Sequence, residues 1–153
     1  MHRIATLAAV TLGLLAPIAP AASAQPGPPS PFTITEQLDF AAGHNTFTAT
    51  GPLCPSGTFV DDVQVFAPPH PVPTTGPNIL IRTVYTCDDG SGTFNALKHV
   101  FVSFGAESVT NTGPFQLLGG TGAYTTLVGH GVDNGVSTGD TGVGEISGFI
   151  TRP

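Results

Sequence analysis

The sequence predicts an all-β protein, a single small antiparallel β-barrel of about eight strands with one disulfide. Short runs rich in Val, Ile, Thr, Phe and Tyr follow one another, and many alternate apolar with polar residues, as half-buried strands do. The 20 Gly and 15 Pro residues would break most helices, and no stretch beyond the N-terminal region keeps a helical period. A closed barrel would also remove the unpaired edges that an open sheet exposes.

The first 24 residues are predicted to be a secretory signal peptide. Arg3 precedes an uncharged apolar stretch from Ile4 to Pro20, and Ala22-Ser23-Ala24 forms a small-x-small cleavage site. The alternative is a membrane anchor, but two prolines interrupt the apolar stretch and no positive flank follows it. We therefore expect cleavage after Ala24, export to the extracellular space or a periplasm, and no membrane association of the mature protein.

The mature chain is predicted to form one barrel domain, residues 32–153, behind a Pro-rich lead-in at residues 25–31 that has nothing to bury. Its strands are expected where β-type residues cluster between turn residues. These runs are Phe32–Phe40, Asn45–Thr50, Thr58–Ala67, Asn78–Cys87, Thr93–Phe104, Phe115–Leu118, Ala123–Val132 and Val143–Thr151.

Gly, Pro and Asp residues mark the connections between these strands. The stretch from Asp88 to Gly92 joins two strong strands and is typical of a hairpin turn, because Asp-Gly supplies the positive φ angles that a tight hairpin needs. Asp133-Asn134-Gly135 and Thr138-Gly139-Asp140 predict further turns. Ala67 to Pro77 is too rich in proline for a central strand, so we expect an extended surface loop.

Cys54 and Cys87 are the only cysteines, and in an exported chain an even pair predicts a disulfide. The bridge would close a loop of roughly 34 residues, for which the chain-entropy model gives about 3–4 kcal/mol of stabilisation. The alternative is a redox or metal-binding pair. The sequence has no Cys-x-x-Cys motif and no histidine at zinc-finger spacing, which favours the structural bridge.

The charge balance argues against several partners. After signal cleavage three basic residues remain, Arg82, Lys98 and Arg152, against all 10 acidic ones. Nucleic acids and anionic membranes require clustered Lys and Arg, so we expect neither as a partner. The histidines show no metal-ligand spacing and the Gly-x-Ser-x-Gly nucleophile motif is absent, so no metal and no cofactor are predicted.

The stretch Gly119-Gly120-Thr121-Gly122-Ala123-Tyr124, followed by Gly129-His130-Gly131, resembles a turn of the allene oxide cyclase and dirigent barrel families. In those calycin-like families a Gly-Gly-Thr/Ser-Gly-x-aromatic turn joins strands of an eight-stranded barrel around a cavity for apolar small molecules. Glycines allow the sharp turn, and the aromatic residue then packs inward. The resemblance implies the barrel fold and a small apolar ligand, and the association of dirigent-type barrels makes a homo-oligomer an expectation.

Glu36 is the candidate catalytic residue. It interrupts an alternating apolar face, and burial there would disfavour the charged form of its carboxylate, as a general acid or base requires. The resembling cyclases also use a glutamate reached from the barrel cavity, which is a similarity of position only. The alternatives are a Glu at the barrel mouth or in a structural pair.

Lys98, Tyr124 and Glu145 are the candidate ligand-binding residues. Lys98 interrupts another apolar face and could pair with Glu36 or Glu145, although such lysines often extend their ammonium to water. Glu145 shares a strand face with Val143, so it too is a charged residue on a partly apolar face. The alternative for Tyr124 is a core aromatic residue whose hydroxyl reaches a hydrogen-bond partner.

Three functions stay open from the sequence. The first is a secreted barrel that binds a small apolar ligand or a protein partner, and the second is a dirigent-like or allene-oxide-cyclase-like cyclase or isomerase. The third is a structural surface or envelope protein whose barrel is filled. A cavity lined by apolar residues with Glu36 inside would favour the first two, and a packed interior would favour the third.

Overall fold

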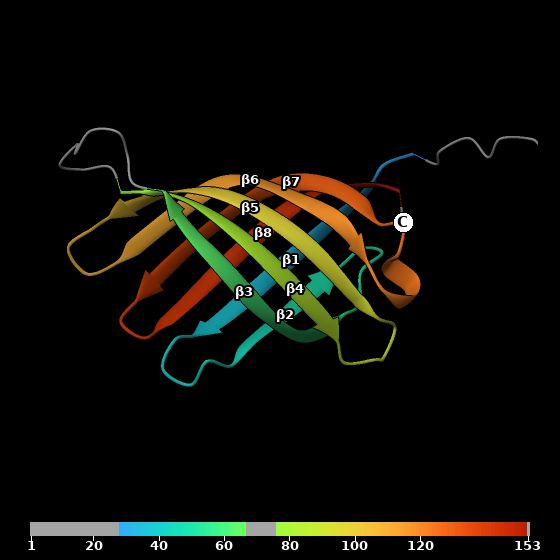
Figure 1. Ribbon diagram of the computed structural model, residues 1–153, viewed down its shortest axis with the longest axis horizontal. Coiled ribbons are helices and arrows are strands. Elements are labelled where there is room, and N and C mark those ends of the chain that lie inside the picture. The colour runs from blue at the N-terminus through green and yellow to red at the C-terminus, as the bar shows by residue number, and fades with distance from the viewer. Residues whose placement is uncertain (1–27, 67–75, 153) are drawn as a thin grey trace, which may run out of the picture.

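The computed structural model describes residues 28–66 and 76–152, which form a closed antiparallel barrel of eight strands. Each strand pairs with the next along the chain, and β8 pairs with β1 to close the barrel (Figure 1). This architecture confirms the predicted fold class. The elements are β1 (Ser30–Asp39), β2 (Asn45–Thr50), β3 (Ser56–Phe66), β4 (Asn78–Cys87), β5 (Thr93–Phe104), β6 (Val109–Gly120), the 3-10 helix η1 (Gly122–Tyr124), β7 (Val128–Thr138) and β8 (Thr141–Arg152).

Most strand positions agree with the prediction, and β2, β4 and β5 have the expected bounds. The region of β6 and β7 differs. Asp133-Asn134-Gly135 was expected to be a turn, but it lies inside β7, where Asn134 pairs with Glu145 and Gly135 with Gly144 of β8. The predicted start of a strand at Ala123 is also wrong, because Ala123 belongs to η1. The pairing of whole strands here overrides the local turn preference.

The predicted loop from Ala67 to Pro77 lies outside the described residues except for its last two positions, and the predicted signal peptide lies entirely outside them. In the part of the chain that the structure describes, no helix has the length and hydropathy needed to cross a bilayer.

The two ends of the barrel differ. We call the end with the β2–β3, β4–β5 and β6–β7 connections the closed end, and the end with the β1–β2, β5–β6 and β7–β8 connections the open end, at the right and left of Figure 1 respectively. Inside the closed end Tyr85 stacks on Phe94 with ring centroids 4.6 Å apart, and Phe47 meets both rings edge-on. These buried aromatic residues fill this half of the barrel, and such ring pairs add to the stabilisation from burial.

Glycines allow a close approach of an aromatic ring at one position and of a neighbouring strand at another. A Cβ at Gly57 would lie 2.6 Å from the Phe47 ring, and one at Gly148 would lie 2.1 Å from the carbonyl oxygen of His130. Small interior positions beside large ones are how a narrow barrel fills its interior. The glycines of β3 and β8 are therefore packing positions, not turns.

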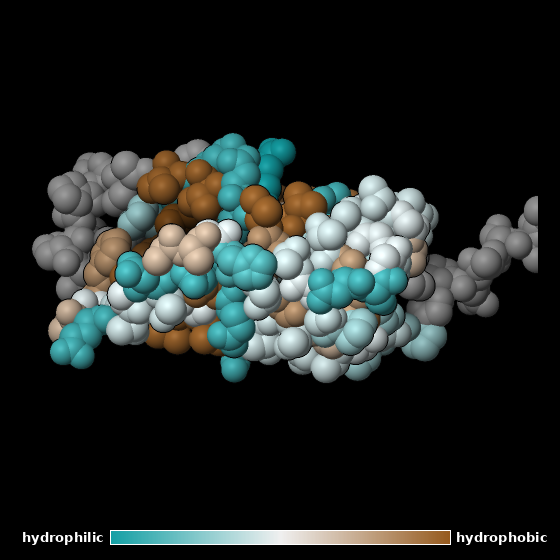
Figure 2. Space-filling view, turned by 90° about the horizontal axis from the view of Figure 1, so that it is seen from below, coloured by the Kyte–Doolittle hydropathy of each residue, from teal (hydrophilic) through white to brown (hydrophobic). Residues whose placement is uncertain are grey.

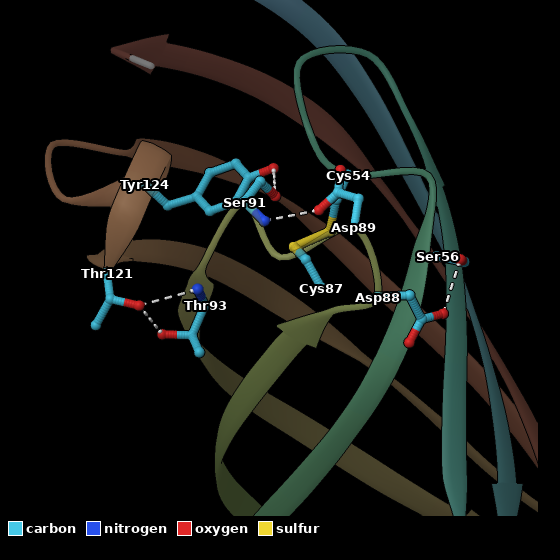
Figure 3. Close-up of a disulfide and its surroundings, with 9 residues drawn as sticks. All are labelled: Cys54, Ser56, Cys87, Asp88, Asp89, Ser91, Thr93, Thr121 and Tyr124. Carbon is cyan, nitrogen blue, oxygen red and sulfur yellow. Dashed lines mark hydrogen bonds between the residues drawn. A yellow bond between two sulfur atoms is a disulfide. The ribbon is translucent and has the colours of Figure 1, made fainter.

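The disulfide lies at the closed end and confirms the predicted pairing. Cys54, in the β2–β3 connection, bonds to Cys87 at the end of β4, with Cα atoms 6.0 Å apart (Figure 3). Beside it, Ser56 Oγ donates a hydrogen bond of 2.9 Å to Asp88 Oδ2. The bridge therefore joins the connection that follows β2, the shortest strand of the barrel, to the end of β4.

The glycine-rich turn that carries the family resemblance closes the same end. Gly119 and Gly122 have φ of 81° and 60°, in the left-handed region that glycine tolerates best. The turn directs Tyr124 inward, where its ring lies 5.4 Å from that of Phe94. Its hydroxyl shares a hydrogen bond of 3.2 Å with Ser91 Oγ in the β4–β5 hairpin (Figure 3). The turn therefore joins two connections of the closed end.

Candidate functional site

The open half of the barrel contains a cavity of about 310 Å³. Its walls are formed by the inward side chains of those parts of the strands that lie near the open end. Most of these side chains are apolar. The apolar wall includes Leu38, Ile79, Ile81, Val100 and Val102. The inward faces that fill the closed half with aromatic rings therefore continue as smaller aliphatic side chains and leave space.

Exposed apolar side chains form the rim of this cavity. Phe40, Val63, Phe104 and Val109 line it, yet each is more than a third exposed. Figure 2 shows apolar side chains gathered over the half of the barrel that carries the open end, with a paler surface over the other half. Large exposed apolar groups around a concave site are typical of a binding surface.

A buried ion pair forms the floor of the cavity. The Lys98 ammonium from β5 donates a hydrogen bond of 2.5 Å to Glu36 Oε1 from β1, and both side chains are almost fully buried. The Tyr85 hydroxyl donates to the same oxygen, also at 2.5 Å. Because Tyr85 belongs to the aromatic stack, this cluster connects the packed half of the barrel to the hollow half.

Lys98 and Tyr85 are both held in their protonated forms. Burial alone would lower the pKa of the Lys98 ammonium, but the carboxylates of Glu36, Asp133 and Asp61 outweigh burial and raise that pKa above its usual value. Burial, and next the negative charge of Glu36, raise the pKa of Tyr85 well above 10.0. Both groups therefore act as hydrogen-bond donors to Glu36.

Asp61 is a second carboxylate of the cavity. It lies on β3 and accepts a hydrogen bond of 2.6 Å from Thr83 Oγ1 of β4. Burial raises the pKa of Asp61, while the charge of Lys98 and the hydrogen bond from Thr83 act against that rise. Its bonded oxygen is thus held in place by the neighbouring strand.

Asp133 of β7 is the third carboxylate of the cavity, and it lacks a full set of hydrogen-bond donors. It is 2% exposed and lines the cavity. Oδ2 accepts one long hydrogen bond of 3.4 Å from Asn111 Nδ2, and Oδ1 is buried without any partner among the described residues. Burial raises the pKa of Asp133 to about 6, with the Lys98 charge acting against the rise. A carboxylate in this state can accept a hydrogen bond, or a proton near neutral pH.

The structure brings two of the predicted site residues together, Glu36 and Lys98, and places the other two elsewhere. Tyr124 belongs to the packed core of the closed end and does not line the cavity. Glu145 is exposed on the outer face of β8, between Thr35 and Asn134. Glu145 therefore does not reach the interior site. The inward positions of β8 are three glycines with Ile146 and Ile150, while Val143 and Phe149 alternate with Glu145, so apolar residues occur on both faces and do not identify the inner one.

Asp61 and Asp133 are two site residues that were not predicted from the sequence. Asp61 lies two residues from the buried Phe59 on an alternating strand, so the period of β3 contained the signal. Asp133 shares its inward face with Gly129, Gly131 and Gly135, and that face has no apolar residue to reveal it. Its position in an Asp-Asn-Gly sequence pointed instead to a turn.

The described residues contain no group of three or more His, Cys, Asp or Glu side chains arranged to hold a metal ion. The site therefore consists of an apolar cavity over one buried ammonium and three carboxylates. Comparisons with protein-family models, with curated proteins and with solved structures give no match, so the function proposed below depends on the site itself.

Proposed function

We propose that this protein is a secreted β-barrel protein that binds a small, mostly apolar molecule in the cavity at its open end. The observation that carries the proposal is the contrast between the two halves of the interior, one packed with aromatic rings and one hollow over a polar floor. An eight-stranded barrel is just wide enough to hold one small ligand, and binding sites are mostly apolar with a few polar groups that fix orientation. A disulfide is compatible with an oxidising compartment such as the extracellular space or a periplasm.

Native mass spectrometry of the exported protein, purified without detergent, tests the proposal. We expect a bound molecule of low molecular mass that organic solvent extracts. The matched variants are Val102→Trp, which fills the cavity, and Val84→Trp, which adds the same bulk to the exposed outer face of β4. If Val102→Trp loses the bound mass and Val84→Trp keeps it, cavity binding is supported. Equal binding in both variants would overturn it.

A second candidate function is a cyclase or isomerase of the kind that the glycine-rich turn resembles. The observation that favours it is Asp133, a cavity carboxylate whose pKa of about 6 suits proton transfer near neutral pH. An enzyme would convert the bound molecule, and Glu36→Gln or Asp133→Asn would abolish turnover while leaving binding measurable. A binder would show no turnover of the molecule that it carries.

A further inference from the structure

Asp133 Oδ1 is an acceptor in need of a donor. The atom is buried, and no group among the described residues donates to it. A buried acceptor without a partner costs free energy, and an ionised one costs more than a neutral one. Asp133 also lines the cavity, so its carboxylate lies beside the space that a bound molecule would occupy.

The charges around the cavity floor are not balanced. Three carboxylates, Glu36, Asp61 and Asp133, face a single ammonium, that of Lys98. Lys98 is already paired with Glu36, and within the described structure no ion pair joins it to Asp61 or Asp133. Arg82 offers no compensation, because it is exposed on the outer face of β4. A negatively charged ligand group would therefore be repelled, and a positively charged one attracted.

The walls restrict the rest of the ligand. Ile79, Ile81, Val100 and Val102 offer aliphatic surface and no hydrogen-bonding side chain. The cavity of about 310 Å³ is at the small end of the range for ligand sites, so one short aliphatic or alicyclic body fits better than a large ring system.

We propose that the ligand of this cavity is a small cationic amphiphile, with an aliphatic body against the walls and one hydrogen-bond-donating ammonium head against Asp133. This inference rests on the proposed binding function and specifies its ligand class. A neutral alcohol would supply the hydrogen bond but not the charge, and a carboxylate would supply neither.

Isothermal titration calorimetry with three molecules of equal chain length tests the head group. The probes are octylammonium, 1-octanol and octanoate, each titrated at pH 7.5, where Asp133 is ionised. We expect octylammonium to bind about 10-fold or more tightly than octanol, since hydrogen bonds to charged groups are the stronger ones. Octanoate is expected to bind weakest of the three.

Asp133→Asn should remove most of the preference for octylammonium over octanol while leaving octanol binding within a few-fold. Asp140→Asn is the matched control, because it changes the net charge equally at an exposed turn and should leave the preference intact. Val102→Trp should abolish binding of octylammonium, which separates the cavity from the acidic surface.

The outcomes distinguish the two proposals. If none of the probes binds, and the exported protein carries no bound molecule, the binding function fails and the ligand class fails with it. If octanol or octanoate binds as tightly as octylammonium, the ligand class is wrong and the binding function stands. The same conclusion follows if Asp133→Asn keeps the full ammonium preference. Because the three head groups are compared on the unmodified protein, this test does not depend on whether any variant folds.

Discussion

Asp133 is expected to destabilise the folded protein at neutral pH, because its buried carboxylate lacks a full set of partners. Its pKa is raised from 3.8 to about 6 on folding, so between these values the folded protein binds more protons than the unfolded chain. The free energy of unfolding should therefore fall as pH rises from about 4 to about 6, by up to about 3 kcal/mol from this group. The raised pKa of Asp61 adds a change of the same sign.

Urea denaturation from pH 4 to pH 7.5 measures this effect. We expect Asp133→Asn to be more stable than the unmodified protein at pH 7.5, by about 1–3 kcal/mol, and to show a flatter pH dependence. Asp140→Asn, at an exposed turn, should leave the curve unchanged. An Asp133→Asn variant that is less stable at pH 7.5 and keeps the full slope would contradict this account.

The Glu36–Lys98 pair predicts strong coupling between two buried residues. Lys98→Met leaves Glu36 buried without its counter-ion, and we expect a loss of about 3–5 kcal/mol. Combining it with Glu36→Gln removes both charges and should recover most of that loss, because the Tyr85 hydroxyl can still donate to the amide oxygen. Chemical denaturation of the four proteins in this cycle gives the coupling energy. Additive losses would show that the pair does not act as a unit, and exposed Glu145→Gln serves as a neutral control.

Among the elements, those with apolar alternation were predictable and those with glycine on the inner face were not. In β5 the inward residues from Phe94 to Val102 include Lys98 as the one polar interruption, and this pattern identified both the strand and the candidate residue. In β7 and β8 the inner face consists largely of glycine. The sequence therefore could not show whether the side chains of Asp133 and Glu145 point into the barrel or away from it. Only the pairing of β7 with β8 determines that orientation.

An inner glycine that lies against the backbone of the neighbouring strand should not tolerate a side chain. A Cβ at position 148 would lie 2.1 Å from a backbone oxygen of β7, which can move only if the strands separate. We expect Gly148→Ala to lower the free energy of unfolding by about 1–3 kcal/mol or more. Gly105→Ala, in the β5–β6 connection, meets its nearest atom at 3.1 Å and should cost less. Thermal unfolding of both variants compares them, and equal melting temperatures would contradict the packing role of Gly148.

For the whole molecule, the sequence predicted a disulfide-bonded barrel but could not show whether the barrel is filled. The volume inside depends on which side chains meet at each level, and that follows from strand register. The aromatic residues Phe47, Tyr85 and Phe94 meet at one level near the closed end, while Ile81, Val100 and Val102 line the other half. The hollow half and its unpartnered carboxylate therefore emerge only from the assembled structure.

The disulfide is expected to stabilise the barrel without shaping the cavity, since it lies at the opposite end. The double variant Cys54→Ala/Cys87→Ala should lose about 3–4 kcal/mol of stability, as the chain-entropy model predicts. At temperatures where this variant remains folded, it should bind octylammonium as the unmodified protein does. Free thiols found in the purified protein, or a double variant of unchanged stability, would contradict this assignment.

One half of the barrel is hollow and the other is packed. Because xenon enters empty apolar cavities, a crystal structure of the ligand-free protein under xenon pressure can show this difference. We predict xenon among Ile81, Val100 and Val102, and none among the aromatic rings at the closed end. A structure in which side chains fill the open half and leave no room for xenon would contradict the account.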